Sequence, residues 1–231
     1  MRPRTEVSTT RTGRSQIRLA VPNALLSSPL LRVGGGLAVY EDLFPEPYFR
    51  KLVAEALARL SCAAEQFAAE PDPEEVRGGQ PQRKFLSIDG GNVQDAIYQS
   101  SATVDLLQQI TYARFAPTGQ RGTYTYYQRA GDHLALHRDV ETCDLALITS
   151  LYSTNPACNG AGLFCAYPDR IEEPLSHIGR TLNEGAVFVD LQPGQTLALL
   201  GGLVPHRVTP VAPGQVKIVS VLCFQLVGGF L

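Results

Sequence analysis

The sequence predicts an α+β chain, mainly β, in which helices near the N-terminus pack outside one sheet of a sandwich or jelly roll. From Thr123 onward the chain is a succession of short β-like runs, separated by turns rich in glycine, proline and asparagine. Before residue 115, apolar residues recur at helical spacing instead. Helices followed by many short strands are typical of helices layered on an antiparallel sheet, not of alternating βαβ units.

Residues 1–33 are predicted to form a flexible arm, because they are rich in arginine, serine and threonine and lack the apolar region of a secretory signal. A short strand over residues 36–40 is then expected to open a single domain spanning 34–231. Its helical part is expected at 34–115 and its jelly-roll core at 120–228.

The helical part contains two predicted helices and one long loop. The first helix carries apolar residues from Phe49 to Phe67 at i, i+3, i+4 and i+7, and should end by Pro71. Residues 71–92 are rich in proline, glycine and charge, which favours a lid or a disordered loop. A second helix is expected over 101–112.

The core contains eight predicted strands and no internal repeat. Each is a short apolar run bounded by turn residues. In chain order they are TYTYYQR, LALH, LALITSLY, GLFCAY, AVFVDL, TLALL, HRVTPV and VKIVSVLCFQL.

Charge and composition limit the partners. The net charge of −2 gives no electrostatic reason to expect a nucleic acid, and no apolar run is long enough to span a bilayer. A small molecule or a peptide is the expected partner, and a monomer and a homodimer stay equally open. Five irregularly spaced cysteines without a CxxC motif predict buried, reduced thiols in a cytoplasmic protein; they are Cys62, Cys143, Cys158, Cys165 and Cys223.

Three polar residues stand where a metal site is plausible. His137 and Asp139 flank one residue at the end of an apolar strand, so both side chains can project to the same side. His206 begins another strand, 67 residues after Asp139. Two imidazoles and one carboxylate form the facial triad of non-haem iron(II), which leaves coordination positions open for other ligands. Lys217 lies eleven residues beyond His206 in an otherwise apolar strand, where it would either reach the surface or face a bound anion.

In this order, YQRAGDHLALHRD, Gly160-Ala-Gly-Leu and HRVTPVAPGQVK resemble the motifs of the iron(II)/2-oxoglutarate-dependent dioxygenases, in particular the prolyl 4-hydroxylase-like branch. The resemblance covers roughly residues 37–224 and implies a double-stranded β-helix, the cupin-like jelly roll. It departs from the family pattern in Ala161 within the glycine pair and in the position of Lys217, one residue farther from His206 than is commonest.

The resemblance implies a set of roles. His137, Asp139 and His206 would bind Fe(II), and Lys217 would pair with the distal carboxylate of 2-oxoglutarate. Tyr127, and less directly Thr149, would contact the same carboxylate. Together with O2, and with ascorbate as an accessory reductant, such a site hydroxylates a C–H bond and releases succinate and CO2.

The substrate is left open by the sequence. A free small molecule, including an amino-acid derivative, is slightly favoured over a prolyl peptide, and Arg83 and Lys84 would suit a lid that recognises a carboxylate. A non-catalytic cupin-like protein that binds a metal or a ligand is the alternative of another class.

Other polar and aromatic residues are expected to be structural. His133 lies too far from His137 along a strand to share a metal, and His177 should be exposed in a polar loop. Arg138 and Arg207 each follow a predicted ligand and should point to the opposite face, with substrate or co-substrate contact as the alternative. The tyrosines of TYTYYQ are expected to pack within the sheet and not to stack on bases.

Overall fold

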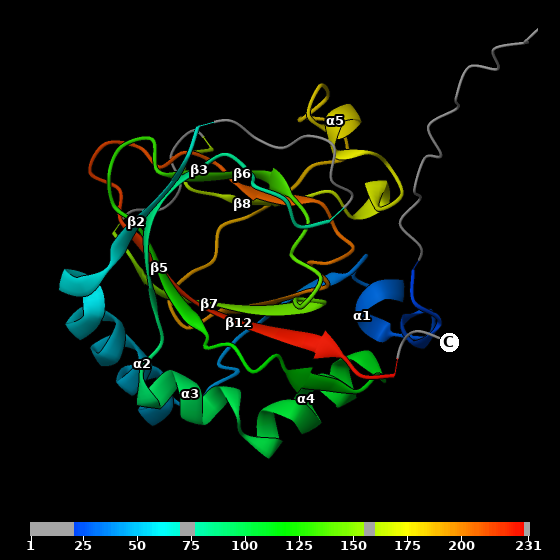
Figure 1. The fold of residues 1–231 in the computed structure, drawn as a ribbon, viewed down its shortest axis with the longest axis horizontal. Helices are drawn as coiled ribbons and strands as arrows, with labels where there is room; N and C mark the ends of the chain where they lie inside the picture. The colour runs from blue at the N-terminus through cyan, green and yellow to red at the C-terminus, as the bar shows by residue number, and fades with distance from the viewer. Residues whose placement is uncertain (1–20, 70–76, 155–159, 229–231) are drawn as a thin grey trace, which may run out of the picture.

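Most of the chain forms antiparallel strands in this computed structural model, which describes residues 21–69, 77–154 and 160–228 (Figure 1). The strands are β1 (Leu37–Tyr40), β2 (Ala64–Ala68), β3 (Arg83–Asp89), β4 (Phe115–Pro117), β5 (Thr123–Tyr127), β6 (His133–His137), β7 (Leu145–Ser153), β8 (Phe164–Ala166), β9 (Val187–Val189), β10 (Thr196–Leu199), β11 (His206–Val208) and β12 (Lys217–Leu226). The helices are α1 (Pro29–Arg32), α2 (Glu46–Arg59), α3 (Asn92–Tyr98), α4 (Ser101–Thr111) and α5 (Leu175–Ile178).

The strands curl into two layers that face each other. One layer has the order β1-β10-β7-β12-β5 and the other the order β6-β11-β8-β9. Strand β3 joins them, because it pairs with β5 on one side and with β6 on the other. The two layers lie one above the other in Figure 1. This arrangement confirms the predicted double-stranded β-helix, and each of the eight predicted runs contains a strand.

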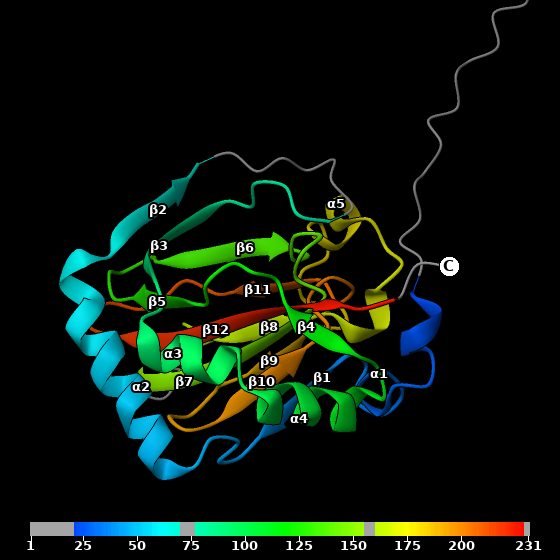
Figure 2. The ribbon, with the colours of Figure 1, turned by 60° about the horizontal axis from the view of Figure 1, so that its bottom comes forward.

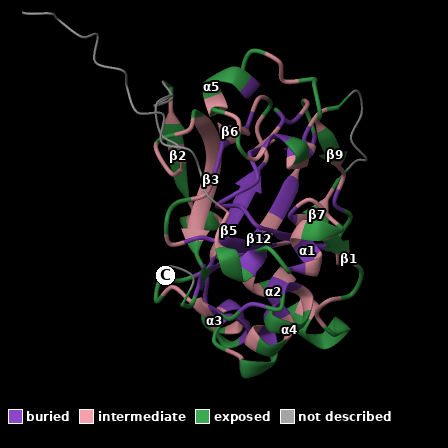
Figure 3. Ribbon diagram, turned by 90° about the vertical axis from the view of Figure 1, so that its right-hand side faces the viewer, coloured by how far each residue is buried: buried purple, intermediate pink, exposed green. Residues whose placement is uncertain are grey.

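Helices α2, α3 and α4 cover the outer face of the layer that contains β7 and β12 (Figure 2). Strand β5 shows how the sequence separates the two faces, since side chains alternate along a strand. Tyr124 and Tyr126 point outward, where their hydroxyls donate to Glu55 (2.6 Å) and to the carbonyl of Ala56 (2.8 Å) on α2. Both tyrosines are fully buried, which agrees with the predicted packing role. Figure 3 shows in purple the buried residues that lie between the helices and the sheet.

The first predicted helix is too long. Helix α2 ends at Arg59, and a short 3-10 turn (Leu60–Cys62) leads into β2, which pairs with β3. Phe67 therefore lies on a strand and is 65% exposed instead of packing on a helix face. Strand β3 itself falls within residues 71–92, which were predicted to be a loop. The helical spacing continued by chance into β2, and tertiary pairing decided the outcome.

The N-terminal boundary also differs from the prediction. Leu25, in the 3-10 turn Asn23–Leu25, and Leu30, in α1, lie within the predicted arm and are buried in the core. Residues 21–33 are therefore packed against the domain, whereas residues 1–20 lie outside the described part of the chain.

The prediction of reduced, buried thiols is confirmed for Cys165 but is wrong for Cys62, Cys143 and Cys223. Cys143 and Cys223 form a disulfide that joins the turn after β6 to β12, across 80 residues. Of the other cysteines, Cys62 is exposed, Cys165 is buried and free, and Cys158 lies outside the described residues. Pairing over such a separation has no local sequence signal. Within the described ranges, no helix is both long and apolar enough to cross a membrane.

Candidate metal centre

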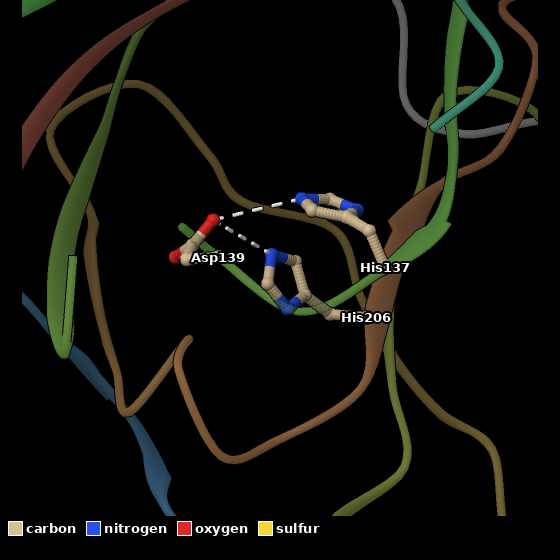
Figure 4. Close-up of side chains that lie close together, drawn as sticks. All are labelled: His137, Asp139 and His206. Carbon is tan, nitrogen blue, oxygen red and sulfur yellow. Dashed lines mark ion pairs between the residues drawn. The ribbon is translucent and has the colours of Figure 1, made fainter. Parts of the chain in front are cut away.

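The two predicted histidine ligands stand on neighbouring strands of the second layer. His137 ends β6 and His206 begins β11, and the two residues are cross-strand partners. Their ring centroids are 4.2 Å apart. Asp139 follows two residues after β6, beyond the end of the strand, and its Oδ1 lies 3.6 Å from Nε2 of each imidazole (Figure 4). The fold thus brings all three predicted residues together.

Backbone contacts fix both imidazoles in one orientation. Nδ1 of His137 lies 2.9 Å from the carbonyl of Ala135, and Nδ1 of His206 lies 2.9 Å from the carbonyl of Val204. A carbonyl oxygen can only accept, so each Nδ1 carries a proton, and the lone pair of a neutral ring then lies on Nε2. Both lone pairs face Asp139. Metal-binding histidines usually donate their other ring N–H to a carbonyl or a carboxylate in this way.

The charges of the cluster suit a cation. Burial, with the neighbouring His206, lowers the pKa of His137, so this ring is neutral at neutral pH. Burial by itself raises the pKa of Asp139, but His206 and His137 lower it more, and the pKa lies well below its usual range. An anionic carboxylate and a neutral imidazole are the protonation states that bind a metal.

The donor set fits iron(II). The three ligand atoms lie within 4.8 Å of one another, close enough for a single ion to reach all of them after small side-chain movements. Two nitrogens and one oxygen on one side leave the opposite side open, as in the 2-His-1-carboxylate centres of non-haem iron. We call His137, Asp139 and His206 the His–Asp–His cluster.

The His–Asp–His cluster opens into a cavity of about 180 Å³ between the two layers. Most of the other lining side chains are apolar. They come from β3, β6, β7, β8, β11, β12 and the segment that includes β9, and comprise Phe85, Leu134, Ala146, Ile148, Phe164, Val189, Leu191, Val208, Val219 and Val221. Such a wall excludes water and holds nonpolar groups.

A second polar group lines the same cavity. Lys217 is buried, and its Nζ lies 2.6 Å from Oδ1 of Asp190, the residue after β9. Tyr127 is the cross-strand partner of Lys217 and also lines the cavity. Burial raises the pKa of Tyr127, so its hydroxyl stays a neutral donor. We call Lys217, Asp190 and Tyr127 the Lys217 cluster.

Thr149 does not share this cavity. Ile148 and Ser150, its neighbours on β7, line the cavity, so Thr149 points to the opposite face. There its hydroxyl lies 3.0 Å from that of Thr196. The prediction that Thr149 contacts the co-substrate is therefore wrong in its register by one residue, and Ser150 is the hydroxyl that faces the cavity.

The remaining histidines take the expected structural places. The Nδ1 of His133 lies 2.8 Å from the carbonyl of Gly131, and the side chain of His177 is 60% exposed beside Glu173. Arg138 is buried on the face opposite the cluster, where it donates to the carbonyls of Leu203, Ile171 and Glu173. Neither Arg138 nor Arg207 lines the cavity.

Three residues around the site had no sequence signal strong enough to find them. Asp190 follows a short apolar strand, and Arg77 lies in a charged loop, so each looks like ordinary surface. Gly201 belongs to a Gly-Gly pair that indicates only a turn. Asp190 pairs with Lys217, Arg77 donates to the Asp139 carbonyl, and the Gly201 carbonyl accepts from the Asp139 N–H, so each role depends on a contact between segments far apart in the sequence.

Comparison with known proteins places the fold. No protein-family model matches the sequence, and no curated protein matches it significantly. Solved structures do match. EctD from S. alaskensis with bound Fe has a TM-score of 0.61 at 15% identity, with 89% of this chain and 80% of that chain covered. A Pseudomonas putida prolyl-4-hydroxylase has a TM-score of 0.53 at 18% identity, with 87% and 98% covered.

HygX from Streptomyces hygroscopicus, solved with nickel, 2-oxoglutarate and hygromycin B, has a TM-score of 0.56 at 8% identity, with 84% of each chain covered. At such identities the likeness establishes the fold. This chain therefore shares the double-stranded β-helix of proteins that bind a metal in this fold.

Proposed function

We propose that this chain is an Fe(II)- and 2-oxoglutarate-dependent oxygenase that hydroxylates, or otherwise oxidises, an unactivated C–H bond of a small molecule. The His–Asp–His cluster carries the proposal, because its three donors converge on an apolar cavity. Two structures of the same fold support it: EctD with bound Fe and HygX with nickel and 2-oxoglutarate.

Each part of the chain has a distinct task in this proposal. The two Nε2 atoms and the Asp139 carboxylate would hold the iron on one side, and the Lys217 cluster would bind the distal carboxylate of 2-oxoglutarate. Bound iron(II) and 2-oxoglutarate supply, with O2, an oxidant strong enough to break a C–H bond, and succinate and CO2 are released. The apolar wall keeps water out and holds the target carbon close to the metal.

The substrate is proposed from the cavity. Its walls are mostly apolar and its volume is about 180 Å³, which favours a small molecule that presents a nonpolar group. HygX, a structure of the same fold, was solved with hygromycin B, so this fold can hold a small-molecule ligand. A prolyl residue of a peptide is the second candidate, supported by the prolyl-4-hydroxylase of the same fold. The net charge of −2 supports either of these over a nucleic acid, and a cytoplasmic location stays a prediction.

Succinate release tests the proposal. Purified protein with Fe(II), 2-oxoglutarate and O2 is screened against amino-acid derivatives, other metabolites and prolyl peptides. We expect succinate to form with at least one class and to disappear in His137→Ala. Succinate formation that persists in His137→Ala would show that the cluster does not carry the activity.

A non-catalytic, cupin-like binding protein is the second candidate, and one contact favours it. The ammonium of Lys217 already has a carboxylate partner, Asp190, within the chain. If that pair is permanent, 2-oxoglutarate lacks its anchor. Tight metal binding without any consumption of 2-oxoglutarate would identify this case.

A further inference from the structure

Asp139 is the least supported member of the His–Asp–His cluster. It follows β6 and has no strand ladder to hold it, whereas both histidines sit on paired strands. Its backbone N–H donates to the carbonyl of Gly201 (2.8 Å). The segment from Arg138 to Asp144 is joined to β12 by the Cys143–Cys223 disulfide, but that bond lies four residues beyond Asp139, so the carboxylate needs further contacts near Asp139 itself.

Arg77 contacts this segment at three points. Its Nε donates to the carbonyl of Asp139 (3.0 Å) and its Nη2 to the carbonyl of Val140 (2.8 Å). Its Nη1 donates to Oδ1 of Asp144 (2.7 Å), in an ion pair whose two side chains are only 15% and 10% exposed. A planar guanidinium can satisfy three acceptors at fixed angles, which an ammonium cannot do with the same geometry.

Asp144 extends the support to the sheet. Its second oxygen, Oδ2, accepts from the backbone N–H of Leu226 on β12 (2.7 Å), and its own N–H donates to the carbonyl of Phe224 (2.9 Å). Arg77 is thereby connected through Asp144 to the longest strand of the molecule. The support is rigid because it ends on a buried strand.

Two consecutive glycines leave room for this arrangement. A Cβ on Gly201 would lie 1.9 Å from Oδ2 of Asp139, and a Cβ on Gly202 would lie 2.4 Å from Nη2 of Arg77. Neither glycine has a positive φ, so backbone conformation does not require them. Gly201 lies against Asp139 and Gly202 lies against the guanidinium of Arg77, which explains why both positions are glycine.

We infer that Arg77 is a positioning residue for the metal centre: through its bonds to Asp139, Val140 and Asp144 it sets the place of the Asp139 carboxylate. This inference rests on the proposed metal site. It assigns a function to Arg77, which lies in the segment between β2 and β3. Residues that orient a metal ligand from outside its coordination sphere typically change metal affinity about 10- to 100-fold when they are replaced.

Arg170 provides a matched control. It is also a buried arginine that holds a loop, with bonds to the carbonyls of Thr181 and Glu184 and an ion pair to Glu173. That loop carries no residue of the His–Asp–His cluster, although its Ile171 and Glu173 carbonyls accept from Arg138. Arg170→Gln should therefore cost stability without changing metal affinity, whereas Arg77→Gln should change both.

The test measures Co(II) binding by calorimetry and the Tm in the presence of a chelator for wild type, Arg77→Gln, Arg77→Lys and Arg170→Gln. We expect the Kd for Co(II) to rise about 10- to 100-fold in Arg77→Gln and to change less than about twofold in Arg170→Gln. Arg77→Lys keeps a cation near Asp144, so we expect it to recover part of the Tm but little of the affinity.

Two results overturn the inference: an unchanged Kd in Arg77→Gln, or full recovery of the Kd in Arg77→Lys. If Arg77→Gln does not fold, the Kd for Co(II) of Arg77→Lys and Gly202→Ala decides. The first variant removes the guanidinium and the second displaces it. The wild-type control separates this inference from the proposed function. If the wild type binds Co(II) but consumes no 2-oxoglutarate, only the proposed function is refuted. If the Kd for Co(II) is the same in the wild type and the Arg77 variants, only the inference about Arg77 is refuted.

Discussion

The two polar clusters of the cavity are held in different ways. In the His–Asp–His cluster, each imidazole is fixed by a main-chain carbonyl two residues earlier, and the two rings stand on paired strands. In the Lys217 cluster, a side-chain ion pair joins Lys217 to Asp190. The carbonyl that holds each imidazole belongs to the main chain and is fixed by the fold, whereas one side-chain or ligand carboxylate can replace another beside an ammonium. The His–Asp–His cluster therefore has a fixed geometry, and Lys217 is able to exchange Asp190 for another carboxylate.

The largest effect is expected from Gly201→Ala, which should disturb the His–Asp–His cluster. The new Cβ would meet Oδ2 of Asp139 at 1.9 Å, so the carboxylate must move away from the imidazoles. Co(II) affinity, measured by calorimetry, should fall at least about 100-fold. Gly179→Ala is the control, since its Cβ would meet the carbonyl oxygens of Leu175 and Ser176 at 3.3 and 3.8 Å. Equal affinities in the two variants would contradict the geometry described for Asp139.

Lys217→Met should affect the Lys217 cluster and leave the His–Asp–His cluster unchanged. Removing a buried charge from an ion pair with a ligand carboxylate typically costs 2 kcal/mol or more, so the Kd for 2-oxoglutarate should rise about 30-fold or more. Titration of the Co(II)-loaded protein with 2-oxoglutarate measures it, and the Co(II) affinity itself should stay the same. A loss of Co(II) affinity would mean that the two clusters are not independent.

Asp190→Asn should act in the opposite direction. It removes the carboxylate that competes for Lys217, so we expect the Kd for 2-oxoglutarate to fall about three- to tenfold, equivalent to roughly 1 kcal/mol. The same titration measures the change. A rise in the Kd would instead show that Asp190 holds Lys217 in its binding position and is not displaced.

The smallest effect lies outside the cavity, at Glu55 on α2. Its carboxylate accepts from the backbone N–H groups of Gly91, Val93 and Gln94 at the start of α3 and from the hydroxyl of Tyr124. Burial raises the pKa of Glu55, but these hydrogen bonds lower it more, so the pKa lies below its ordinary value.

Because the folded pKa is lowered, the stability from Glu55 is present above roughly pH 4.3, the unfolded value, and is lost as the pH falls through the folded pKa. Glu55→Gln should cost about 1 kcal/mol of unfolding free energy at pH 7 and flatten the acid limb of the stability curve. Urea titrations from pH 3 to 7 check this, with 2-oxoglutarate affinity as the unaffected quantity. An unchanged acid limb would remove Glu55 from the account of acid stability.

The sequence predicts the parts of the site that depend on local pattern. Short apolar runs between turns place β5 to β12, and the spacing of His137, Asp139 and His206 places three donors at strand ends. Thr149 was misplaced because the sequence does not reveal which face of a long apolar strand is inward. A shift of one residue reverses every side chain.

The supports of the site depend on tertiary contacts and leave almost no sequence pattern. Arg77 and Asp144 are 67 residues apart, and Cys143 and Cys223 are 80 apart. Strand β2 carries a helical apolar pattern and becomes a strand only through its pairing with β3. Such pairings depend on the whole fold, so a local pattern cannot predict them.

One absorption measurement tests the central claim, that the His–Asp–His cluster and the Lys217 cluster together bind iron(II) and 2-oxoglutarate. Adding Fe(II) and then 2-oxoglutarate to the wild-type protein without oxygen should produce a weak metal-to-ligand charge-transfer band in the visible region. The same additions to Asp139→Ala, with its fold verified by circular dichroism, should produce none. Absence of the band in the wild type, or an equal band in Asp139→Ala, would contradict the claim.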